Sequence, residues 1–336
     1  MLMEALNTSC IDQEYMPTLH SLCSQNNTLY CPNTKQLTQG AMSIGGQLIV
    51  MSGLNGLRND IFVSSYPDNL YPSIAHEMAA NKHCNTGVIL STESNFWRQD
   101  NVNKQLGIQN CWGKKEIESA ISEPIYNKNN LLDDKTVFDF AATTICSSTQ
   151  PFLYLIVPSN MHSAYMVDKK IACDAKFSDI NDVYLHEYMR RARYLDDQIA
   201  AFINELKARG VYEDTLIVVT SDHQVSNTYC SDAMKESLSP YIPAIFINTG
   251  ADWAEQNERN KDVVFCHSQV YPTMLQLMGL RPEKYAGLFP PMTNIEATQE
   301  YDFANCAYET TTDKRIKQIY DIEEKIIRSS YFGVME

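Results

Sequence analysis

Two adjacent side chains that can bind a metal, Asp222 and His223, follow an apolar run that is typical of a buried strand. The run, Thr215–Val219, is rich in β-branched residues, and open α/β folds place their active sites at the carboxyl ends of such strands. Carboxylate and imidazole groups both bind divalent cations. An Asp-His pair also occurs in ordinary turns, where the imidazole bonds a backbone carbonyl, so the pair alone leaves both interpretations open.

Three further polar side chains could meet this pair at one edge of a parallel sheet. Glu4 ends a short apolar stub, and His162 follows the apolar run Phe152–Val157. Ser43 lies in Gly40–Gln47, where small residues leave room for a tetrahedral group and glycine amides can approach an anion. Taken singly, Glu4 also fits a terminal residue, Ser43 a turn and His162 a surface loop. Taken together, they predict a site at the sheet edge.

Glu4, Ser43, Asp222 and His223 together could hold one divalent metal ion. Two carboxylates, an imidazole and a hydroxyl suit Mn²⁺, Zn²⁺ or Mg²⁺, and the imidazole favours the first two. Such a cation would lower the pKa of the Ser43 hydroxyl and polarise a phosphoryl oxygen. His267 precedes a predicted helix and is interpreted as a packed core residue, outside the ligand set.

The elements that would position these residues alternate between apolar runs and amphipathic stretches, which predicts an α/β layered fold. The clearest helix extends from Val183 to Arg209, with apolar residues every three or four positions and Gly210 at its end. Further helices are expected after Pro72, over Ser268–Leu280 and over Asp313–Arg328. The candidate parallel strands are Thr86–Leu90, Phe152–Val157, Leu216–Thr220 and Ile242–Ile247.

Composition narrows the class of protein. The chain has 336 residues, of which 44% are hydrophobic and 20% charged, as in globular proteins. Its formal net charge of −14 argues against a nucleic-acid partner, which would need clustered basic residues. The basic cluster Arg190, Arg191 and Arg193 is followed by acidic residues and is predicted to be a solvated helix face. Ten scattered cysteines form no metal or redox motif, and the sequence indicates neither their pairing nor an oligomeric state.

The start of the sequence is similar to the last residues of a strand. Met1–Leu6 is apolar apart from Glu4, and nothing in it resembles a signal peptide. No apolar run in the sequence approaches the roughly 20 residues that cross a bilayer. We therefore expect a soluble domain excised from a longer protein.

The segment Tyr188–His223 resembles the corresponding segment of lipoteichoic acid synthase-type enzymes, in the sulfatase branch of the alkaline phosphatase superfamily. Within it the similar stretches are Tyr194–Asp196, Leu206–Thr215 and Ser221–His223. Elsewhere they are Met3–Asn7, Met16–Leu19, Met42–Leu48, Ser52–Leu54, Asn95–Asp100, Ser159–Ser163 and Tyr271–Gly279. The resemblance implies an α/β, alkaline phosphatase-like fold: a mostly parallel central sheet, helices on both faces and a small C-terminal α+β portion. It divides the chain into a catalytic domain at 1–290 and an extension at 291–336.

The resemblance also assigns roles to residues. It implies that Ser43 is the nucleophile and that His162, Trp97 and Arg98 face the substrate. The implied metal ligands are Glu4, Ser43, Asp222 and His223, with Mn²⁺ the expected ion. The implied reaction is phosphotransfer or phosphodiester hydrolysis on a phosphoglycerol- or phosphoethanolamine-like headgroup, carried by a lipid or a glycan. The implied location is the extracytoplasmic side of a bacterial membrane, with an anchoring segment ahead of Met1.

Several positions depart from the family pattern. The phosphoglycerol-transferring members carry Thr where this chain has Ser43, and an Arg expected at position 99 is Gln99, next to Arg98. A His expected before the Phe-Trp pair falls near Leu90 or Ser91. Sulfatases of this branch need a Cys/Ser-x-Pro-x-Arg motif that Ser43–Gln47 lacks, which favours phosphoryl transfer over sulfate hydrolysis. A catalytically inactive binding domain is a third hypothesis.

The segment after the nucleophile is predicted in two ways. Gln47–Met51 is β-branched enough to favour a strand, whereas the resemblance implies a helix there.

Overall fold

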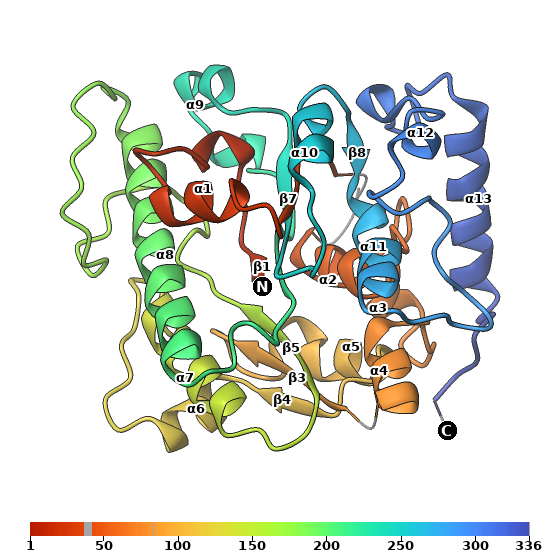
Figure 1. Ribbon diagram of the computed structural model, residues 1–336, viewed down its shortest axis with the longest axis horizontal. Coiled ribbons are helices and arrows are strands. Elements are labelled where there is room, and N and C mark those ends of the chain that lie inside the picture. The colour runs from red at the N-terminus through yellow and green to blue at the C-terminus, as the bar shows by residue number, and fades with distance from the viewer. Residues whose placement is uncertain (37–41, 83, 336) are drawn as a thin grey trace.

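The computed structural model describes residues 1–36, 42–82 and 84–335 (Figure 1). Gly40 and Ala41 of the predicted nucleophile segment therefore lie outside the described residues. The strands are β1 (Leu2–Met3), β2 (Leu29–Lys35), β3 (Asn85–Leu90), β4 (Asn110–Trp112), β5 (Phe152–Val157), β6 (Ile217–Ser221), β7 (Ile242–Ile247) and β8 (Phe265–Cys266).

Helices connect and cover these strands. They are α1 (Pro17–Cys23), α2 (Met42–Ser52), α3 (Phe62–Ser65), α4 (Ile74–Lys82), α5 (Gln99–Gln105), α6 (Lys114–Ala120), α7 (Asp134–Cys146), α8 (Val183–Ala208), α9 (Asp232–Ser237), α10 (Ala254–Asn260), α11 (Val270–Leu277), α12 (Ile295–Thr298) and α13 (Lys314–Arg328). Two 3₁₀ turns matter for the site: η2 (Phe96–Arg98) and η4 (His267–Gln269).

The strands form two hydrogen-bonded ladders, β4-β3-β5 and β1-β6-β7-β2-β8. In the second ladder β1 pairs with β6 in parallel, with Leu2 opposite Thr220 and Met3 opposite Ser221. Because β1 also contacts β5, the two ladders adjoin in one central layer. Most of the pairings are parallel, as expected. The strand β7 is antiparallel to β6 and β2, so the prediction that Ile242–Ile247 is a parallel strand is wrong.

Helices cover both faces of this layer, which confirms the predicted α/β architecture (Figure 1). On one face α1, α7 and α8 bury Leu19, Val137 and Ile199 in a single apolar cluster. On the other face α2, α4 and α11 bury side chains in a second cluster that includes Leu48 and Ile74. The sheet is therefore buried on both sides, which explains the continuous apolar runs of β5, β6 and β7.

The structure decides between the two predictions for Gln47–Met51, which lies in α2. The segment is helical, so the strand predicted from β-branching is wrong and the implied helix is confirmed. Leu48 and Ile49 of α2 are fully buried, so tertiary packing overrides the weak local preference.

Residues 291–335 pack against the rest of the chain through α13. Ile316, Ile319 and Tyr320 share a small apolar cluster with Phe289 and Cys266. Among these residues the structure describes helices and one isolated antiparallel bridge, which joins Val334 to Asn69. The division at residue 290 stays a prediction.

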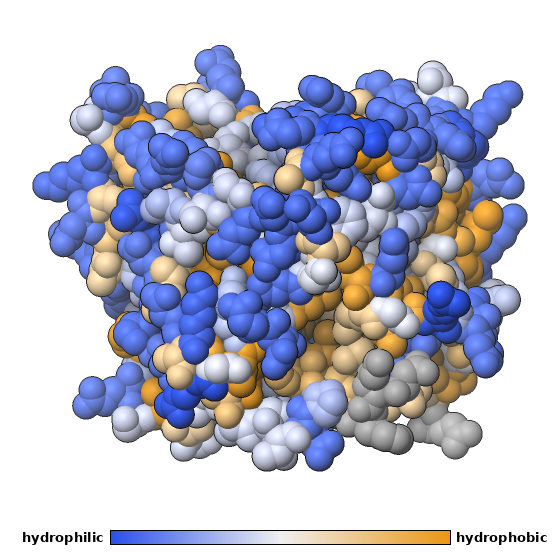
Figure 2. Space-filling view, viewed as in Figure 1, coloured by the Kyte–Doolittle hydropathy of each residue, from blue (hydrophilic) through white to orange (hydrophobic). Residues whose placement is uncertain are grey.

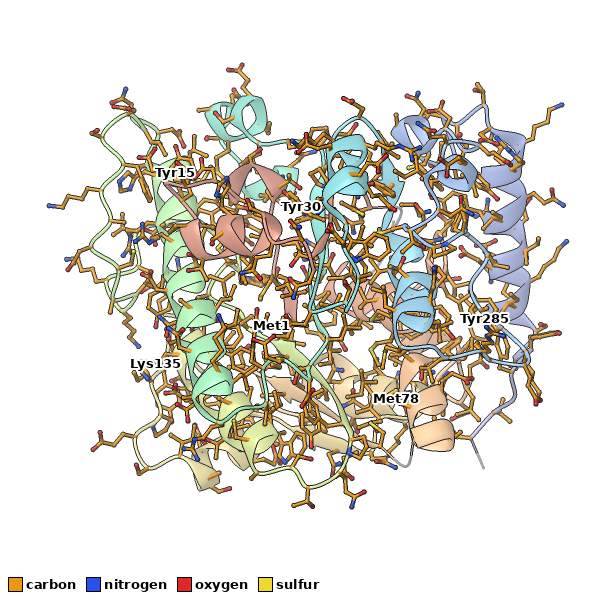
Figure 3. The ribbon with its side chains drawn as sticks, viewed as in Figure 1. Met1, Tyr15, Tyr30, Met78, Lys135 and Tyr285 are labelled. Atoms are coloured by element: carbon orange, nitrogen blue, oxygen red, sulfur yellow. The ribbon has the colours of Figure 1, made fainter. Side chains whose placement is uncertain are left out.

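An apolar hollow of about 360 Å³ lies beside the N-terminus, between β5 and β6. It is lined by Leu153 and Leu155 of β5, Val218 of β6, Met78 of α4 and Met1. Figure 2 shows apolar side chains gathered in the lower middle of this face, and Figure 3 labels Met1 and Met78 there. The Met1 backbone nitrogen donates to the Val218 carbonyl at 2.7 Å.

Two general properties complete the description. The described residues include all ten cysteines, and each is a free thiol. Every helix in the described ranges is too short or too polar to span a lipid bilayer.

Candidate metal centre and active site

Three chain segments that end at one sheet edge bring the predicted ligands together. Glu4 follows β1, and Asp222 and His223 follow the neighbouring strand β6. Ser43 lies in the first turn of α2, which packs over the same edge. The parallel pairing of β1 with β6 is what aligns Glu4 with Asp222, because it sets Met3 opposite Ser221.

The four side chains are in mutual contact. The Nε2 atom of His223 lies 3.1 Å from Oε1 of Glu4 and 3.5 Å from Oδ2 of Asp222. The Ser43 Oγ lies 3.5 Å from Oε2 of Glu4 and 3.4 Å from Nε2 of His223. Glu4, Asp222 and His223 each offer a ligand atom within 4.8 Å of the others. One cation could therefore contact all of them.

The Asp222 carboxylate is fixed by the backbone on one side only. Its Oδ1 accepts hydrogen bonds from the Ala5 amide at 2.9 Å and from the His223 amide at 2.8 Å. Its Oδ2 is buried and has no hydrogen-bond donor among the described residues. That oxygen lies 3.5 Å from Nε2 of His223, and a cation in the cluster would compensate its charge more directly than this ring does.

The His223 ring is held in the tautomer that a metal ligand needs. Its Nδ1 lies 2.7 Å from the carbonyl oxygen of Gln224, so Nδ1 donates and Nε2 faces the cluster. Burial opposes protonation of this ring, but the carboxylates of Asp222 and Glu4 raise its pKa above the usual value. Burial and the neighbouring Glu4 charge raise the pKa of Asp222. Two carboxylates this close favour a bound positive charge, from a proton or from a metal.

The turn that carries Glu4 is fixed by Tyr188 of α8. The Tyr188 hydroxyl donates to the Ala5 carbonyl at 2.8 Å and accepts from the Asn7 amide at 3.1 Å. Ala5 has a positive φ of 47°, a strained conformation for a residue with a side chain. The Tyr188 contacts stabilise this turn and so aim the Glu4 carboxylate at the cluster.

Gly46 allows α2 to approach the end of β6. A Cβ atom at this position would lie 2.3 Å from the Asp222 carbonyl oxygen and 2.7 Å from its Cα. No side chain fits in that space, so glycine is required for this close approach. The glycine thus brings Ser43, three residues earlier on the same helix, up to the Asp222 and His223 side chains.

These residues fit a divalent cation. The donor set consists of two carboxylates, one imidazole nitrogen and one hydroxyl, which suits Mn²⁺, Zn²⁺ or Mg²⁺. The Oδ2 of Asp222 accepts no hydrogen bond within the described residues, which also favours a positive charge in the cluster.

His162 lies on the long connection between β5 and α8. The pKa of Glu4 is lowered, against the effect of burial, mainly by His223 and to a smaller extent by His162. The His162 ring is exposed, and its Nδ1 lies 2.6 Å from the Ser163 carbonyl oxygen. The segment before it is anchored to α7, because Oδ1 of Asp134 accepts from the amides of Ser159 and Asn160. The structure thus places His162 outside the cluster, near enough to Glu4 for an electrostatic interaction.

Trp97 and Arg98 lie after β3, on the 3₁₀ turn η2. Both are exposed, and both have positive φ values, 50° and 57°. Within the described ranges, no hydrogen bond or ion pair joins either side chain to the four clustered residues. The next residue, Gln99, is buried and exchanges hydrogen bonds with Gln47 of α2 at 2.7 and 3.0 Å. Gln99 therefore ties this turn to the nucleophile helix and points away from solvent.

His267 agrees with its predicted role as a core residue. It is fully buried, and burial lowers its pKa to about 3. In the described part of the chain neither of its ring nitrogens has a hydrogen-bond partner.

The prediction of a solvated face at Arg190, Arg191 and Arg193 is wrong for Arg191. Arg191 is 1% exposed and pairs with the equally buried Glu187 at 3.0 Å. A signal was present in the sequence, because Arg191 lies one helical turn after the buried Tyr188 and four residues after Glu187. The acidic residues at 196 and 197 obscured it.

The comparisons with known proteins agree on one family. The model of the family named Sulfatase matches residues 49–280. A lipoteichoic acid synthase from Staphylococcus saprophyticus subsp. saprophyticus is 27% identical over 325 residues, covering 94% of this chain and 50% of the relative. The chain thus spans about half the length of that relative.

Solved structures share the fold. A lipoteichoic acid synthase from Listeria monocytogenes superposes with a TM-score of 0.73 and 17% identity, covering 98% of this chain and 90% of the other. An alkaline phosphatase superfamily protein from Vibrio parahaemolyticus gives the same TM-score and identity, covering 99% and 87%. The alkaline phosphatase-like fold expected from the sequence is therefore confirmed.

Proposed function

The chain belongs to the sulfatase family, and on this premise we propose that it is a metal-dependent phosphotransferase with Ser43 as its nucleophile. The observation that carries the proposal is the contact of Ser43 Oγ with Glu4 and His223, at 3.5 and 3.4 Å, in a cluster completed by Asp222. A hydroxyl in this position has two carboxylates and an imidazole around it, and these groups can hold a cation. This combination supports attack on a phosphoryl group.

The metal ligands proposed are Glu4, Ser43, Asp222 and His223, with Mn²⁺ preferred to Zn²⁺ or Mg²⁺. A bound cation would supply positive charge that favours the ionised Ser43 hydroxyl and offsets negative charge on the phosphoryl oxygens.

Ser43 Oγ attacks phosphorus, so that an Oγ–P bond forms while the bond from phosphorus to the leaving alcohol oxygen breaks. The proton of Ser43 passes to solvent. The leaving oxygen takes a proton from His162, whose ring is exposed and interacts electrostatically with Glu4. The product of this half-reaction is a covalent phosphodiester on Ser43 and a free alcohol.

The second half-reaction reverses these roles. An acceptor hydroxyl, or water, attacks the phosphorus on Ser43 and gives its proton to His162. The Oγ–P bond breaks, and Ser43 regains a proton from solvent. Transfer and hydrolysis differ only in the acceptor.

The substrate proposed is a phosphoglycerol- or phosphoethanolamine-like headgroup on a lipid or a glycan. The support is the name of the Staphylococcus relative, a lipoteichoic acid synthase, together with the exposed Trp97 and Arg98 on the turn that Gln99 ties to α2. We place this reaction at the extracytoplasmic face of a bacterial membrane, as the family resemblance implies. Arg98 would pair with the phosphate, and Trp97 would cover the headgroup.

Turnover of bis-p-nitrophenyl phosphate and Mn²⁺ affinity by calorimetry test the proposal. Ser43→Ala should abolish turnover, and Asp222→Asn should abolish both Mn²⁺ binding and turnover. Ser52→Ala is the matched control, because Ser52 lies in the same helix but bonds the Leu48 carbonyl. Intact mass after incubation should show a phosphodiester adduct on the wild type and none on Ser43→Ala. Full turnover in Ser43→Ala would overturn the mechanism.

A further inference from the structure

The connection between β5 and α8 is long, and it contains neither a helix nor a strand. It covers residues 158–182 and carries His162. Backbone carbonyls in such a segment lack the partners that regular structure supplies, so a loop of this kind needs other donors to hold one conformation.

Arg191 of α8 supplies these donors. Its Nη1 donates to the carbonyls of Asn160 at 3.3 Å and His162 at 2.8 Å. Its Nη2 donates to the carbonyls of Ala164 at 3.3 Å and Met166 at 2.8 Å. These four carbonyls belong to every second residue of the loop. A single planar guanidinium therefore fixes residues 160–166, the stretch that carries His162.

Glu187 orients the guanidinium. Its Oε1 accepts from Nε of Arg191 at 3.0 Å, and both side chains are 1% exposed. All five N–H bonds of Arg191 are thereby used: one on Glu187 and four on the loop. Lysine offers three donors on a point charge and cannot reproduce this fork.

Two of the four carbonyls have a second donor. Lys128 Nζ also reaches the Ala164 and Met166 carbonyls, at 2.9 and 3.2 Å. The His162 carbonyl depends on the Nη1 branch of Arg191, which therefore acts where the loop approaches the site.

We propose that Arg191, oriented by Glu187, is a positioning residue that sets His162 against the Ser43 cluster. The proposal rests on the function proposed above, since it assigns to His162 the proton transfer of that reaction. Arg191 does not touch the cluster. It acts through the backbone of residues 160–166 and through the ring of Tyr165, over which its guanidinium lies at 5.7 Å.

Arg190 provides a matched control. It also pairs with Glu187, at 2.9 Å, but its guanidinium bonds the carbonyls of Asp168 at 2.6 Å, Ile171 and Cys173, which follow the four carbonyls held by Arg191. Arg190→Lys thus makes the same chemical change on the same helix, with the same carboxylate partner.

The experiment is a double-mutant cycle in kcat for bis-p-nitrophenyl phosphate, with Mn²⁺ affinity measured for each variant. Arg191→Lys should lower kcat about tenfold or more and leave Mn²⁺ affinity within about twofold, because a displaced acid loses its geometry while the metal ligands stay. Arg190→Lys should change kcat by less than about threefold. In the His162→Ala background, Arg191→Lys should cost no more than about twofold. Equal losses in both backgrounds, or an unchanged kcat in Arg191→Lys, would overturn the proposal.

Amide hydrogen exchange separates this proposal from the proposed function. If the wild type turns over no phosphodiester, the proposed function fails, but Arg191→Lys should still speed exchange at residues 160–166 and leave residues 4–7 unchanged. Unchanged exchange at 160–166 would refute the positioning role. Glu187→Gln is a second variant, in which the guanidinium and its four carbonyls remain. Glu187→Gln should also lower kcat and speed exchange at residues 160–166, but by less than Arg191→Lys. It therefore tests the proposal if Arg191→Lys does not fold.

Discussion

Gly46→Ala is the substitution whose effect follows most directly from the geometry of the site. The added Cβ would lie 2.3 Å from the Asp222 carbonyl oxygen, about 1 Å short of the 3.4 Å at which ordinary contacts begin. The nearest atoms are backbone atoms of Asp222, which have no side-chain rotation to relieve the overlap. Either α2 or the end of β6 must therefore move by about 1 Å.

That displacement separates Ser43 from His223, because the two belong to the two elements that move apart. A misplacement of about 1 Å in a catalytic group costs roughly 100-fold in rate, and we expect kcat in Gly46→Ala to fall by about that factor. Mn²⁺ affinity should also fall, since Ser43 is on one side of the gap and Asp222 on the other. The overpacking should lower the free energy of unfolding by about 1 to 3 kcal/mol, measured by urea denaturation.

Gly250→Ala is the control for stability. Gly250 has a φ of +77° and open space at its Cβ, and it follows β7 at the opposite edge of the sheet. Alanine in that conformation should cost about 1 to 2 kcal/mol, similar to the loss expected for Gly46→Ala, with kcat and Mn²⁺ affinity unchanged. If Gly46→Ala retained wild-type kcat and Mn²⁺ affinity, α2 would not set the position of Ser43 and the reasoning would be refuted.

Three further predictions use other parts of the molecule. Burial raises the pKa of Glu323, which bonds Asn55, to about 8, whereas the unfolded chain releases that proton near pH 4.5. Between pH 5 and pH 8 the free energy of unfolding of the wild type should therefore fall by about 3 to 4 kcal/mol more than that of Glu323→Gln, as measured by urea denaturation. Equal falls in the two proteins would contradict this. Trp97 is 65% exposed and packs in no core cluster, so Trp97→Ala should raise KM about tenfold without changing the melting temperature; unchanged KM would remove it from the substrate site. An extension of five β-branched residues ahead of Met1 should enter the hollow between β5 and β6 and stabilise the fold by about 2 kcal/mol or more. A five-residue Gly-Ser extension should not. Equal melting temperatures for the two extended proteins would show that the hollow does not accept a strand.

Much of the site could be predicted from the sequence, because strand ends are visible as boundaries of apolar runs. The runs ending before His162 and Asp222 correspond to β5 and β6, with boundaries within one residue. In a parallel sheet these boundaries share an edge, so residues far apart in the chain converge without further information. Glu4 and Ser43 needed the family resemblance, since a terminal glutamate and a serine among glycines each have ordinary explanations.

Strand direction and local packing could not be predicted in this way. The sequence of β7 is as apolar as that of β5, and nothing within Ile242–Ile247 distinguishes an antiparallel strand from a parallel one. The strand β2 was not predicted at all, because it contains Pro32 and has an irregular register between Cys31 and Thr34. The helix α2 forms where β-branched residues favour a strand, because Gly46 and the buried Leu48 fit only that packing.

The wrong prediction for Arg191 shows why the pattern of charges along a sequence does not predict which charged residues are buried. A buried guanidinium is costly unless all of its donors are satisfied, so a basic residue next to acidic ones is interpreted as solvated. Here the compensation comes from Glu187 on the same helix and from carbonyls about 25 to 31 residues earlier in the chain. Carbonyl groups are present in every residue and leave no trace in a sequence pattern. Only the path of the loop reveals them.

The helix α8 contacts both halves of the proposed reaction from a single face. Tyr188 holds the Ala5 turn that aims the ligand Glu4, and Arg191, one turn later, holds the loop that carries His162. Asp196 extends the contacts by accepting from two amides at the start of α1. Because one rigid helix carries all of these contacts, a shift of α8 would move Glu4 and His162 together, and their separation would be kept. A substitution at Tyr188 or Arg191 removes one contact directly and reaches the other only through the ring of Tyr165, which interacts with both side chains. It is therefore the individual side chains of α8, more than its position, that determine the geometry between the metal ligands and the proton donor.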